Sequence, residues 1–323
     1  MKKRLISLLL ICCAFCACLS SCETSDKKAD STYVFYSFTD STGMTVNLPS
    51  RPEKVAVLFS SYAEIWTLAG GDVSVTVGES VERGFADIGA LLVDSGAGHS
   101  QIDLETLVAS KPDLVIGSTD YECQLSAVKR CADLGIPSAA FKVETLDDYL
   151  KVLKIMCDIN ENAAAYETYG VSVEKNAREI VDRFVSDNKD RTTNILFIRA
   201  GSSARSTKAK NADNNFVCAM LDELGTHNIA DTGSPLLDSL SLEYVLKNQP
   251  DYIFISTMGD ESSSREYVSS LFESEGWREL VAVQNGAYAF LPKDLFHYKP
   301  NSRWDLSYVY LIDLLETEFA SEN

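Results

Sequence analysis

The segment DLETLVASKPDLVIGS, residues 103–118, aligns without gaps to SLEYVLKNQPDYIFIS, residues 241–256. Both copies have Leu, Glu, Pro, Asp and Ser at matching positions, and most of the other apolar positions also coincide. Each copy predicts a short helix, a Pro-Asp turn and a buried strand. Two such units in one chain indicate two similar lobes that face each other across a cleft.

Strands and helices alternate around the first copy. A β-hairpin is expected at residues 33–48, with its turn at residues 40–43. Beyond it, short apolar runs predict strands, and apolar residues at spacings of three and four predict helices. This alternation is typical of an α/β lobe with a mainly parallel sheet. We expect strands at residues 55–59, 73–77, 113–117 and 138–142, and helices at residues 62–69, 104–109, 124–134 and 146–157.

A long stretch without a strand separates this pattern from a second one. Between about residues 160 and 187 the apolar spacing predicts a helix with one buried stripe, although Gly170 lies near its middle. The α/β pattern restarts at residue 193 and ends with a helix at about residues 303–319. The predicted fold therefore has two α/β lobes with mainly parallel central sheets, a single long connector helix and a ligand cleft between the lobes. The expected boundaries are residues 32–144 for the N-terminal lobe, 145–190 for the helical connector and 191–323 for the C-terminal lobe.

Residues 1–21 have the features of a secretory signal peptide. KKR at residues 2–4 precedes a mostly apolar run, and small residues follow it. LSSC at residues 19–22 resembles the bacterial lipobox, in which the Cys is acylated after cleavage. An ordinary signal peptide is the alternative. Two acyl chains on Cys22 would anchor the protein at a membrane surface, and residues 22–31 would form a flexible tether.

Composition and missing motifs narrow the classes of function. The 323-residue chain has a formal charge of −18 at pH 7, so it lacks the basic surface that nucleic-acid binding needs. It contains no G-x-S-x-G, no G-x-x-x-x-G-K and no G-x-G-x-x-G after a strand, which disfavours a hydrolase or dehydrogenase. We expect a monomeric binding protein without an intrinsic cofactor, not an enzyme. The Cys residues beyond Cys22 fit no metal motif and are expected to be free and largely buried: Cys123, Cys131, Cys157 and Cys218.

Several motifs occur in a specific order along the chain. D-x-x-G-x-x-V-x-L-P-x-x-P-x-x-V spans residues 40–55, Glu64 precedes LAG at residues 68–70, the two repeat copies follow, and W-x-x-L-x-A-V-x-N-G with a later L-P spans residues 277–292. Together they resemble the substrate-binding lipoproteins of ABC importers for ferric siderophores, haem and cobalamin. The resemblance covers nearly all of the mature chain. It implies a partnership with an ABC permease dimer and its cytoplasmic ATPase.

The resemblance also implies two docking residues. In that family one surface Glu on each lobe enters Arg pockets of the permease, and the matching positions are Glu105 and Glu243. The alternative is that both are solvated residues, favoured in the first turn of a helix by its dipole. A pair of binding lobes that serves as a sensor or adhesin, without a transporter, also stays open.

The loop after the strand at residue 193 suggests the charge of the ligand. Ligands of such lobes bind at the carboxyl ends of the strands. This loop carries Arg199, Ser202 and Arg205, and two Lys residues follow before the first acid. Clustered cations favour an anionic ligand, although a solvated basic loop is the alternative. We therefore expect a ferric siderophore or haem, with cobalamin or bare zinc or manganese as alternatives.

Aromatic and His residues in the other cleft loops complete the candidate site. His and Tyr can ligate haem iron, or they can simply line a cleft. A bare-metal site needs several His and carboxylates that converge, and two cleft His residues do not fill one. The remaining candidates for ligand binding are Tyr62, His99, Tyr121, His297, Tyr298, Arg303 and Trp304.

Overall fold

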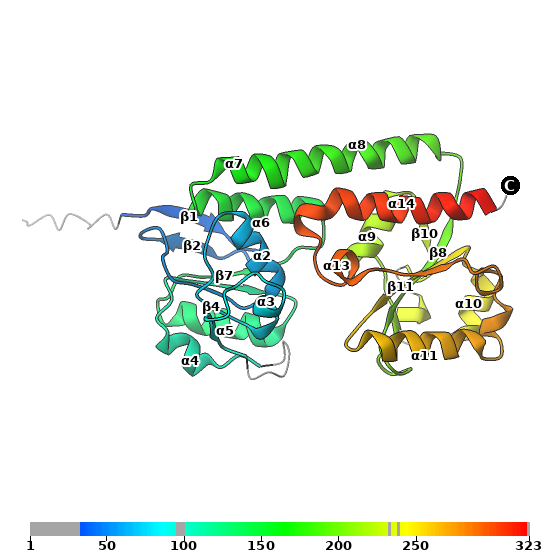
Figure 1. Cartoon of the computed structure of the whole chain (residues 1–323), viewed down its shortest axis with the longest axis horizontal. Coiled ribbons are helices and arrows are strands. Elements are labelled where there is room, and N and C mark those ends of the chain that lie inside the picture. Colours follow the sequence, from blue (N-terminus) through cyan, green and yellow to red (C-terminus); the bar gives the residue numbers. More distant parts are fainter. Residues whose placement is uncertain (1–32, 95–100, 232–233, 238–239, 322–323) are drawn as a thin grey trace, which may run out of the picture. The chain divides into compact units, whose positions relative to one another are not determined.

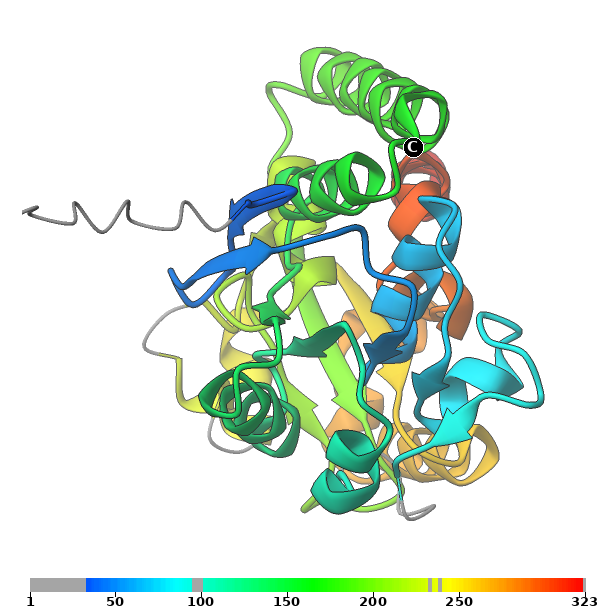
Figure 2. The same ribbon diagram turned by 90° about the vertical axis from the view of Figure 1, so that its left-hand side faces the viewer.

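The computed structural model describes residues 33–94, 101–231, 234–237 and 240–321 (Figures 1 and 2). The expected signal peptide and tether, Cys22 and His99 all lie outside the described residues. Within the described ranges, no helix has both the length and the apolar character needed to cross a bilayer.

The first lobe contains a five-stranded parallel sheet in the order β5-β4-β3-β6-β7, preceded by the antiparallel hairpin β1-β2. The predicted hairpin, strands and helices are confirmed, with ends shifted by a few residues. In chain order the elements are β1 (Tyr36–Thr39), β2 (Thr45–Leu48), β3 (Val55–Val57), α2 (Ser60–Leu68), β4 (Val75–Thr76), α3 (Gly78–Glu82), β5 (Leu91–Leu92), α4 (Leu104–Ala109), β6 (Leu114–Ser118), α5 (Glu122–Asp133) and β7 (Ser138–Phe141).

Two elements of this lobe were missed by the sequence analysis. The helix α3 and the edge strand β5 lie between the strand expected at residues 73–77 and the helix at residues 104–109. Both are too short to show a helical or strand period, since α3 has five residues and β5 has two. The omission matters because α3 carries Glu79, which lines the cleft described below.

The connector is helical, as predicted. The helix α6 (Leu146–Ile159) begins at a capping box made by Thr145 and Asp148 and packs on α2. A turn at residues 160–162 reverses the chain into α7 (Ala163–Tyr166), the π-helical η2 (Glu167–Val171) and α8 (Ser172–Asp187), which form one long helix. Figures 1 and 2 both show this helix on the outer side of α6 and of the C-terminal helix α14 (Trp304–Ser321).

Gly170 does not break the long helix. A Cβ atom at this position would lie 3.0 Å from the ring of Tyr166 and 3.3 Å from the side chain of Leu153 on α6. Glycine therefore allows a close approach between the connector helix and α6, and the backbone accommodates it as a π-helical turn.

The second lobe has a parallel sheet in the order β10-β8-β11-β12, and β9 pairs with β8 in the antiparallel direction. Short helices connect its strands, and α14 returns along α8. Besides α14, the elements are β8 (Asn194–Ala200), β9 (Lys208–Ala209), α9 (Phe216–Glu223), β10 (His227–Asn228), η3 (Pro235–Leu237), α10 (Leu242–Asn248), β11 (Tyr252–Thr257), α11 (Glu261–Glu273), η4 (Trp277–Glu279), α12 (Val281–Gln284), β12 (Tyr288–Phe290), α13 (Lys293–Phe296) and η5 (Asn301–Arg303).

The repeated sequence corresponds to a repeated structure. In the first lobe it forms α4 and β6, and in the second lobe it forms α10 and β11. Asp103 and Ser241 cap the two helices with their side chains. Lys111 and Gln249, at equivalent positions before the Pro, both have positive φ, 53° and 39°. The two lobes therefore share backbone conformation as well as sequence at this unit.

The Asp of each Pro-Asp turn also has the same role in both lobes. Asp113 accepts hydrogen bonds from the backbone N–H groups of Glu53 and Lys54 at 3.0 and 2.8 Å. Asp251 accepts one from the backbone N–H of Asn194 at 2.7 Å. Each carboxylate thus joins its own strand to the start of the neighbouring strand and satisfies backbone donors there.

Three of the four Cys residues that follow the predicted signal are free thiols, as expected, namely Cys131, Cys157 and Cys218. Cys131, Cys157 and Cys218 are buried, whereas Cys123 is partly exposed. Burial raises the pKa of Cys131 and Cys218, and it raises the pKa of Cys157 to about 11.

We predict that Asp251→Ala lowers the free energy of unfolding by about 1–2 kcal/mol, because the N–H of Asn194 loses its acceptor. Asp113→Ala should have an effect of similar size. Urea denaturation of the purified domain measures both. The control is Asp187→Ala at the exposed end of α8, which should change stability by less than about 0.5 kcal/mol. Equal stability of Asp251→Ala and the control would contradict the assigned role.

Candidate functional site

A cleft with a volume of about 560 Å³ lies where the carboxyl ends of strands from both lobes meet. In the first lobe its walls follow β3, β6 and β7 and include α3. In the second lobe they come from the ends of β8 and β11, the start of α9 and the segment after α13. Parallel sheets place ligand sites at this edge. The lining residues are Phe59, Glu79, Asp120, Tyr121, Lys142, Glu144, Arg199, Asp213, Asn214, Asn215, Phe216, Ser256, Met258, Phe296, His297, Tyr298 and Lys299.

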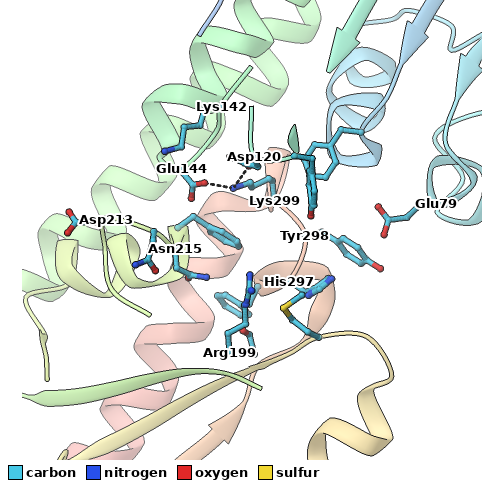
Figure 3. A pocket seen from close by; sticks show the side chains of 17 residues that line it. Glu79, Asp120, Lys142, Glu144, Arg199, Asp213, Asn215, His297, Tyr298 and Lys299 are labelled. Atoms are coloured by element: carbon cyan, nitrogen blue, oxygen red, sulfur yellow. Dashed lines mark hydrogen bonds and ion pairs between the residues drawn. The ribbon is translucent and has the colours of Figure 1, made fainter. Parts of the chain in front are cut away.

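Arg199, near the end of β8, is a cation of the cleft wall (Figure 3). It is partly buried, its Nε has no hydrogen-bond partner, and no carboxylate of the described residues forms an ion pair with it. Burial lowers the pKa of Arg199, and Tyr121 opposes that shift. A guanidinium remains charged at neutral pH, so Arg199 has hydrogen-bond donors available for an acceptor that enters the cleft.

Lys299 is a second cation of the cleft, but its charge is already compensated. Its Nζ lies 3.1 Å from Glu144 Oε1 and 3.8 Å from Asp120 Oδ2, and Figure 3 shows it between these two carboxylates. The Nζ is also 5.1 Å from the ring centroid of Phe216. Lys299 belongs to the second lobe and both carboxylates to the first, so this group of charges bridges the two lobes.

His297 and Tyr298 follow α13 and lie together on the cleft wall, with their ring centroids 4.8 Å apart. Burial lowers the pKa of His297, and nearby Lys293 lowers it further. The imidazole is therefore neutral at pH 7 and can offer one donor and one acceptor. Burial raises the pKa of Tyr298, which keeps its phenol neutral as well.

Aromatic rings form much of the remaining wall. The rings of Phe59 and Tyr121 lie 5.6 Å apart in the first lobe, and Phe216 and Phe296 line the second. Burial raises the pKa of Tyr121, and Asp120 raises it further. The surface therefore combines apolar area with a few polar groups, which is typical of sites for organic ligands.

A buried polar network adjoins the cleft at Tyr298. Glu64 on α2 accepts hydrogen bonds from Asn301 Nδ2 at 2.8 Å and Arg303 Nη2 at 3.2 Å. Arg83 Nη2 lies 3.5 Å from Glu64, and its guanidinium carbon lies 3.7 Å from the ring centroid of Tyr298. Burial raises the pKa of Glu64 more than Arg303, Asn301 and Arg83 lower it.

Four of the predicted ligand-binding residues line the cleft, namely Tyr121, Arg199, His297 and Tyr298. The structure places three others away from the lining of the cleft. Tyr62 is fully buried and packs edge-on against Phe59 and Phe141.

Trp304 is also fully buried, and its ring lies 6.0 Å from that of Phe216. Arg303 binds Glu64 and is not among the lining residues. The expectation that Tyr62, Arg303 and Trp304 line the cleft is therefore corrected.

The predicted cluster of cations does not form at the cleft. β9 turns back along β8, with Lys208 opposite Arg199, so Ser202 and Arg205 lie in an exposed turn away from the lining. Ser202 and Arg205 are close to Arg199 in sequence, but the antiparallel strand β9 directs the turn that carries them away from the cleft. His99 lies outside the described residues.

The structure brings several charged residues to the cleft that were not among the predicted binding residues. Asp120 and Glu144 follow β6 and β7, so the strand-end rule could have found them. Glu79 could not be found that way because α3 itself was missed. With Asp213, the cleft carries four carboxylates and three cations, a mixed charge instead of a purely basic one.

Groups of three or more metal-binding side chains are absent from the part of the chain that the structure describes. The two predicted docking residues, Glu105 and Glu243, are exposed in the first turns of α4 and α10. Neither forms an ion pair within the described residues.

Two similar α/β lobes, a single helical connector and a cleft of ligand size at the strand ends define a two-lobed binding protein. The chain belongs to the periplasmic binding protein family, whose model matches residues 55–295.

Relatives of this family differ in the ligands that they are named for. A cobalamin-binding protein of Halobacterium salinarum is 26% identical over 227 residues, which is 68% of this chain and 58% of the relative. The fold is similar to that of the periplasmic vitamin B12 binding protein of Vibrio cholerae (TM-score 0.67, 20% identity, 84% of this chain and 99% of that chain). It is also similar to Staphylococcus aureus SirA in complex with staphyloferrin B (TM-score 0.66, 16% identity, 88% and 98%).

We predict that His297→Asn reduces the loss of stability on acidification. Because burial lowers the pKa of His297, the unfolded chain takes up this proton first, at its ordinary pKa of about 6.5. Stability therefore falls as the pH drops below about 6.5, and the loss is complete below the lower pKa of the folded protein. Urea unfolding of the ligand-free protein at pH 7 and pH 5 measures the difference.

The control for this measurement is Arg205→Ala, at an exposed position in the turn after β8. It should keep the pH dependence of the wild type. An unchanged difference between pH 7 and pH 5 in His297→Asn would show that this imidazole does not contribute.

Proposed function

We propose that this protein is the substrate-binding protein of an ABC importer, anchored by a lipid on Cys22, and that it captures a ferric siderophore or haem outside the cytoplasmic membrane. It delivers the ligand to a permease dimer with a cytoplasmic ATPase and performs no chemistry itself. Membership of the periplasmic binding protein family supports the transport role. The motif at residues 19–22 supports the anchor.

The environment of Arg199 is the main support for an anionic ligand. Its partly buried guanidinium lines the cleft without a carboxylate partner, and its Nε lacks an acceptor. An anionic oxygen of a siderophore chelate or a haem propionate would accept hydrogen bonds from this guanidinium. Because Glu144 and Asp120 compensate Lys299, the cleft favours a ligand with few negative charges over a polyanion.

Cobalamin is the second candidate. The curated relatives in Halobacterium salinarum are named for cobalamin binding, and the aromatic wall around Phe59 and Tyr121 also suits a large organic ring. Zinc or manganese is less favoured, since a bare ion needs converging His and carboxylate ligands.

We predict that the purified domain binds one iron chelate in a panel of ferric hydroxamate, catecholate and carboxylate siderophores, haemin, cyanocobalamin, Zn²⁺ and Mn²⁺. Arg199→Ala should weaken binding by about 10–100-fold, the loss expected for hydrogen bonds to a charged group. Isothermal titration calorimetry measures each affinity.

Arg205→Ala is the matched control, because it removes the same charge from an exposed position six residues further along the chain, in the turn after β8, and should bind like the wild type. Binding of cyanocobalamin alone would support the second candidate. Binding of only the bare ions, or of none of the panel, would overturn the proposed ligand class.

Glu105 and Glu243 are the proposed contacts with the permease. Each is exposed in the first turn of a capped helix, and the two occupy equivalent positions of the structural repeat. Their equivalence gives one acidic contact on each lobe, which suits a permease built as a dimer. Neither residue lines the cleft, so docking and ligand binding use separate surfaces.

We predict that Glu105→Arg with Glu243→Arg abolishes uptake of the ligand by intact cells and leaves its affinity for the purified protein unchanged. The reason is that charge reversal replaces attraction to a basic pocket with repulsion. Uptake of labelled ligand and calorimetry measure the two effects. Glu273→Arg, at an exposed position on α11, is the control and should transport normally.

The membrane fraction must contain equal amounts of all these variants. Normal uptake by the double variant would overturn the docking proposal. Absence of the wild-type protein from the membrane fraction would count against the anchor on Cys22.

A further inference from the structure

One short segment of the second lobe, residues 298–303, contacts several elements of the first lobe, and we call it the interlobe strap. Tyr298 packs its ring under the guanidinium of Arg83, and Lys299 lies between the carboxylates of Glu144 and Asp120. These two strap residues also line the cleft, directly after His297. The conformation of the strap therefore decides where part of the cleft wall lies.

The other end of the strap is held by a single carboxylate on α2. Asn301 Nδ2 donates to Glu64 Oε2 at 2.8 Å and to the backbone oxygen of Ser61 at 2.9 Å. Arg303 Nη2 donates to the other oxygen, Glu64 Oε1, at 3.2 Å. Both oxygens of Glu64 are thus used to hold the strap.

The backbone at Asn301 shows how closely this end is defined. Asn301 is fully buried and has a φ of 53°, in the left-handed region that Asn tolerates better than most residues. Its side chain is fixed at the same time by Glu64 and by the backbone of Ser61. The strap therefore turns sharply at a residue that the first lobe holds in place.

A charged residue is a costly way to hold two surfaces together. Glu64 is only 6% exposed, and an apolar contact of similar size would avoid the loss of hydration. Its hydrogen bonds to Asn301 and Arg303, however, have defined directions and lengths, which apolar contacts lack. These contacts therefore suit Glu64 to fixing the position of the strap more than to raising the stability of the fold.

We propose that Glu64 is a positioning residue for ligand binding, which fixes the strap through Asn301 and Arg303 and so holds the cleft wall ready before the ligand arrives. A preformed wall spares the ligand the entropy cost of ordering it. The effect on affinity rests on the proposed binding function, whereas the effect on the strap exists in the ligand-free protein.

The first test is hydrogen exchange of the ligand-free Glu64→Gln variant. Gln keeps the size of Glu and one acceptor for Asn301 but removes the charge that Arg303 binds. The reporters are the backbone N–H groups of Tyr298 and Arg303, which donate to Lys293 O at 3.2 Å and Pro300 O at 3.0 Å. We expect both to exchange about tenfold faster, while the amides of β6 and β11 keep their wild-type rates.

Glu273→Gln is the matched control, because it removes the same charge from an exposed position on α11 and should leave all of these rates unchanged. Unchanged exchange of the strap in Glu64→Gln overturns the proposal. An equal increase in the strap, β6 and β11 also overturns it, since that pattern indicates a general loss of stability.

Arg303→Gln removes the same contact by changing its more exposed partner. This variant replaces Glu64→Gln in the experiment if Glu64→Gln fails to fold. It should give the same local increase. Both substitutions remove the contact between Glu64 and Arg303, although Glu64 also pairs with Arg83 and Arg303 also donates to Pro300 O. The double variant should therefore show a smaller increase in exchange than the two single effects added together predict. Additive increases would show that Glu64 and Arg303 act independently and would overturn the proposal.

The second test is affinity for whichever ligand of the panel the wild type binds. Glu64→Gln should bind about tenfold more weakly, through faster dissociation, and Glu273→Gln should bind like the wild type. Equal affinity of Glu64→Gln and the wild type overturns the link between strap and cleft. If the wild type binds no ligand of the panel, the proposed function fails, and the exchange experiment alone decides the role of Glu64 in the strap.

Discussion

Both central sheets are mainly parallel, and the candidate site depends on that constraint. Parallel strands all end at one edge of a sheet, so the loops that follow them gather there. In this protein the loops after β6 and β7 supply Asp120 and Glu144, and the end of β8 supplies Arg199. Because the two sheets present these edges to a common cleft, charges far apart in the sequence act on one ligand-sized space.

The repeat made much of the fold predictable. Its helix, turn and strand are local features that a short segment is enough to predict. A capping residue indicates the helix, a Pro-Asp pair the turn and an apolar run the strand. The structure adds that Lys111 and Gln249 share a left-handed conformation and that Asp113 and Asp251 bind the neighbouring strand. Neither residue type demands that conformation, so only the structure could show it.

The interior of the candidate site was less predictable because it depends on side-chain direction and on distant partners. The sequence places Tyr62 at the start of an expected helix beside a cleft loop, but α2 already begins at Ser60 and turns the ring of Tyr62 into the core. The sequence does not indicate that Arg303 is bound by Glu64, because the two residues are more than two hundred positions apart. Lys299 likewise has distant partners. Two carboxylates of the other lobe compensate its charge, so a ligand in the cleft meets less positive charge than the sequence suggests.

The buried thiols have a consequence for the chemistry of the whole molecule. A thiol reacts with oxidants and disulfides mainly as its thiolate, and a pKa of about 11 leaves Cys157 with roughly one thiolate in ten thousand molecules at pH 7. Burial similarly suppresses ionisation of Cys131 and Cys218. The core around these three thiols is therefore held by packing alone, and the thiols themselves react slowly with oxidants and disulfides.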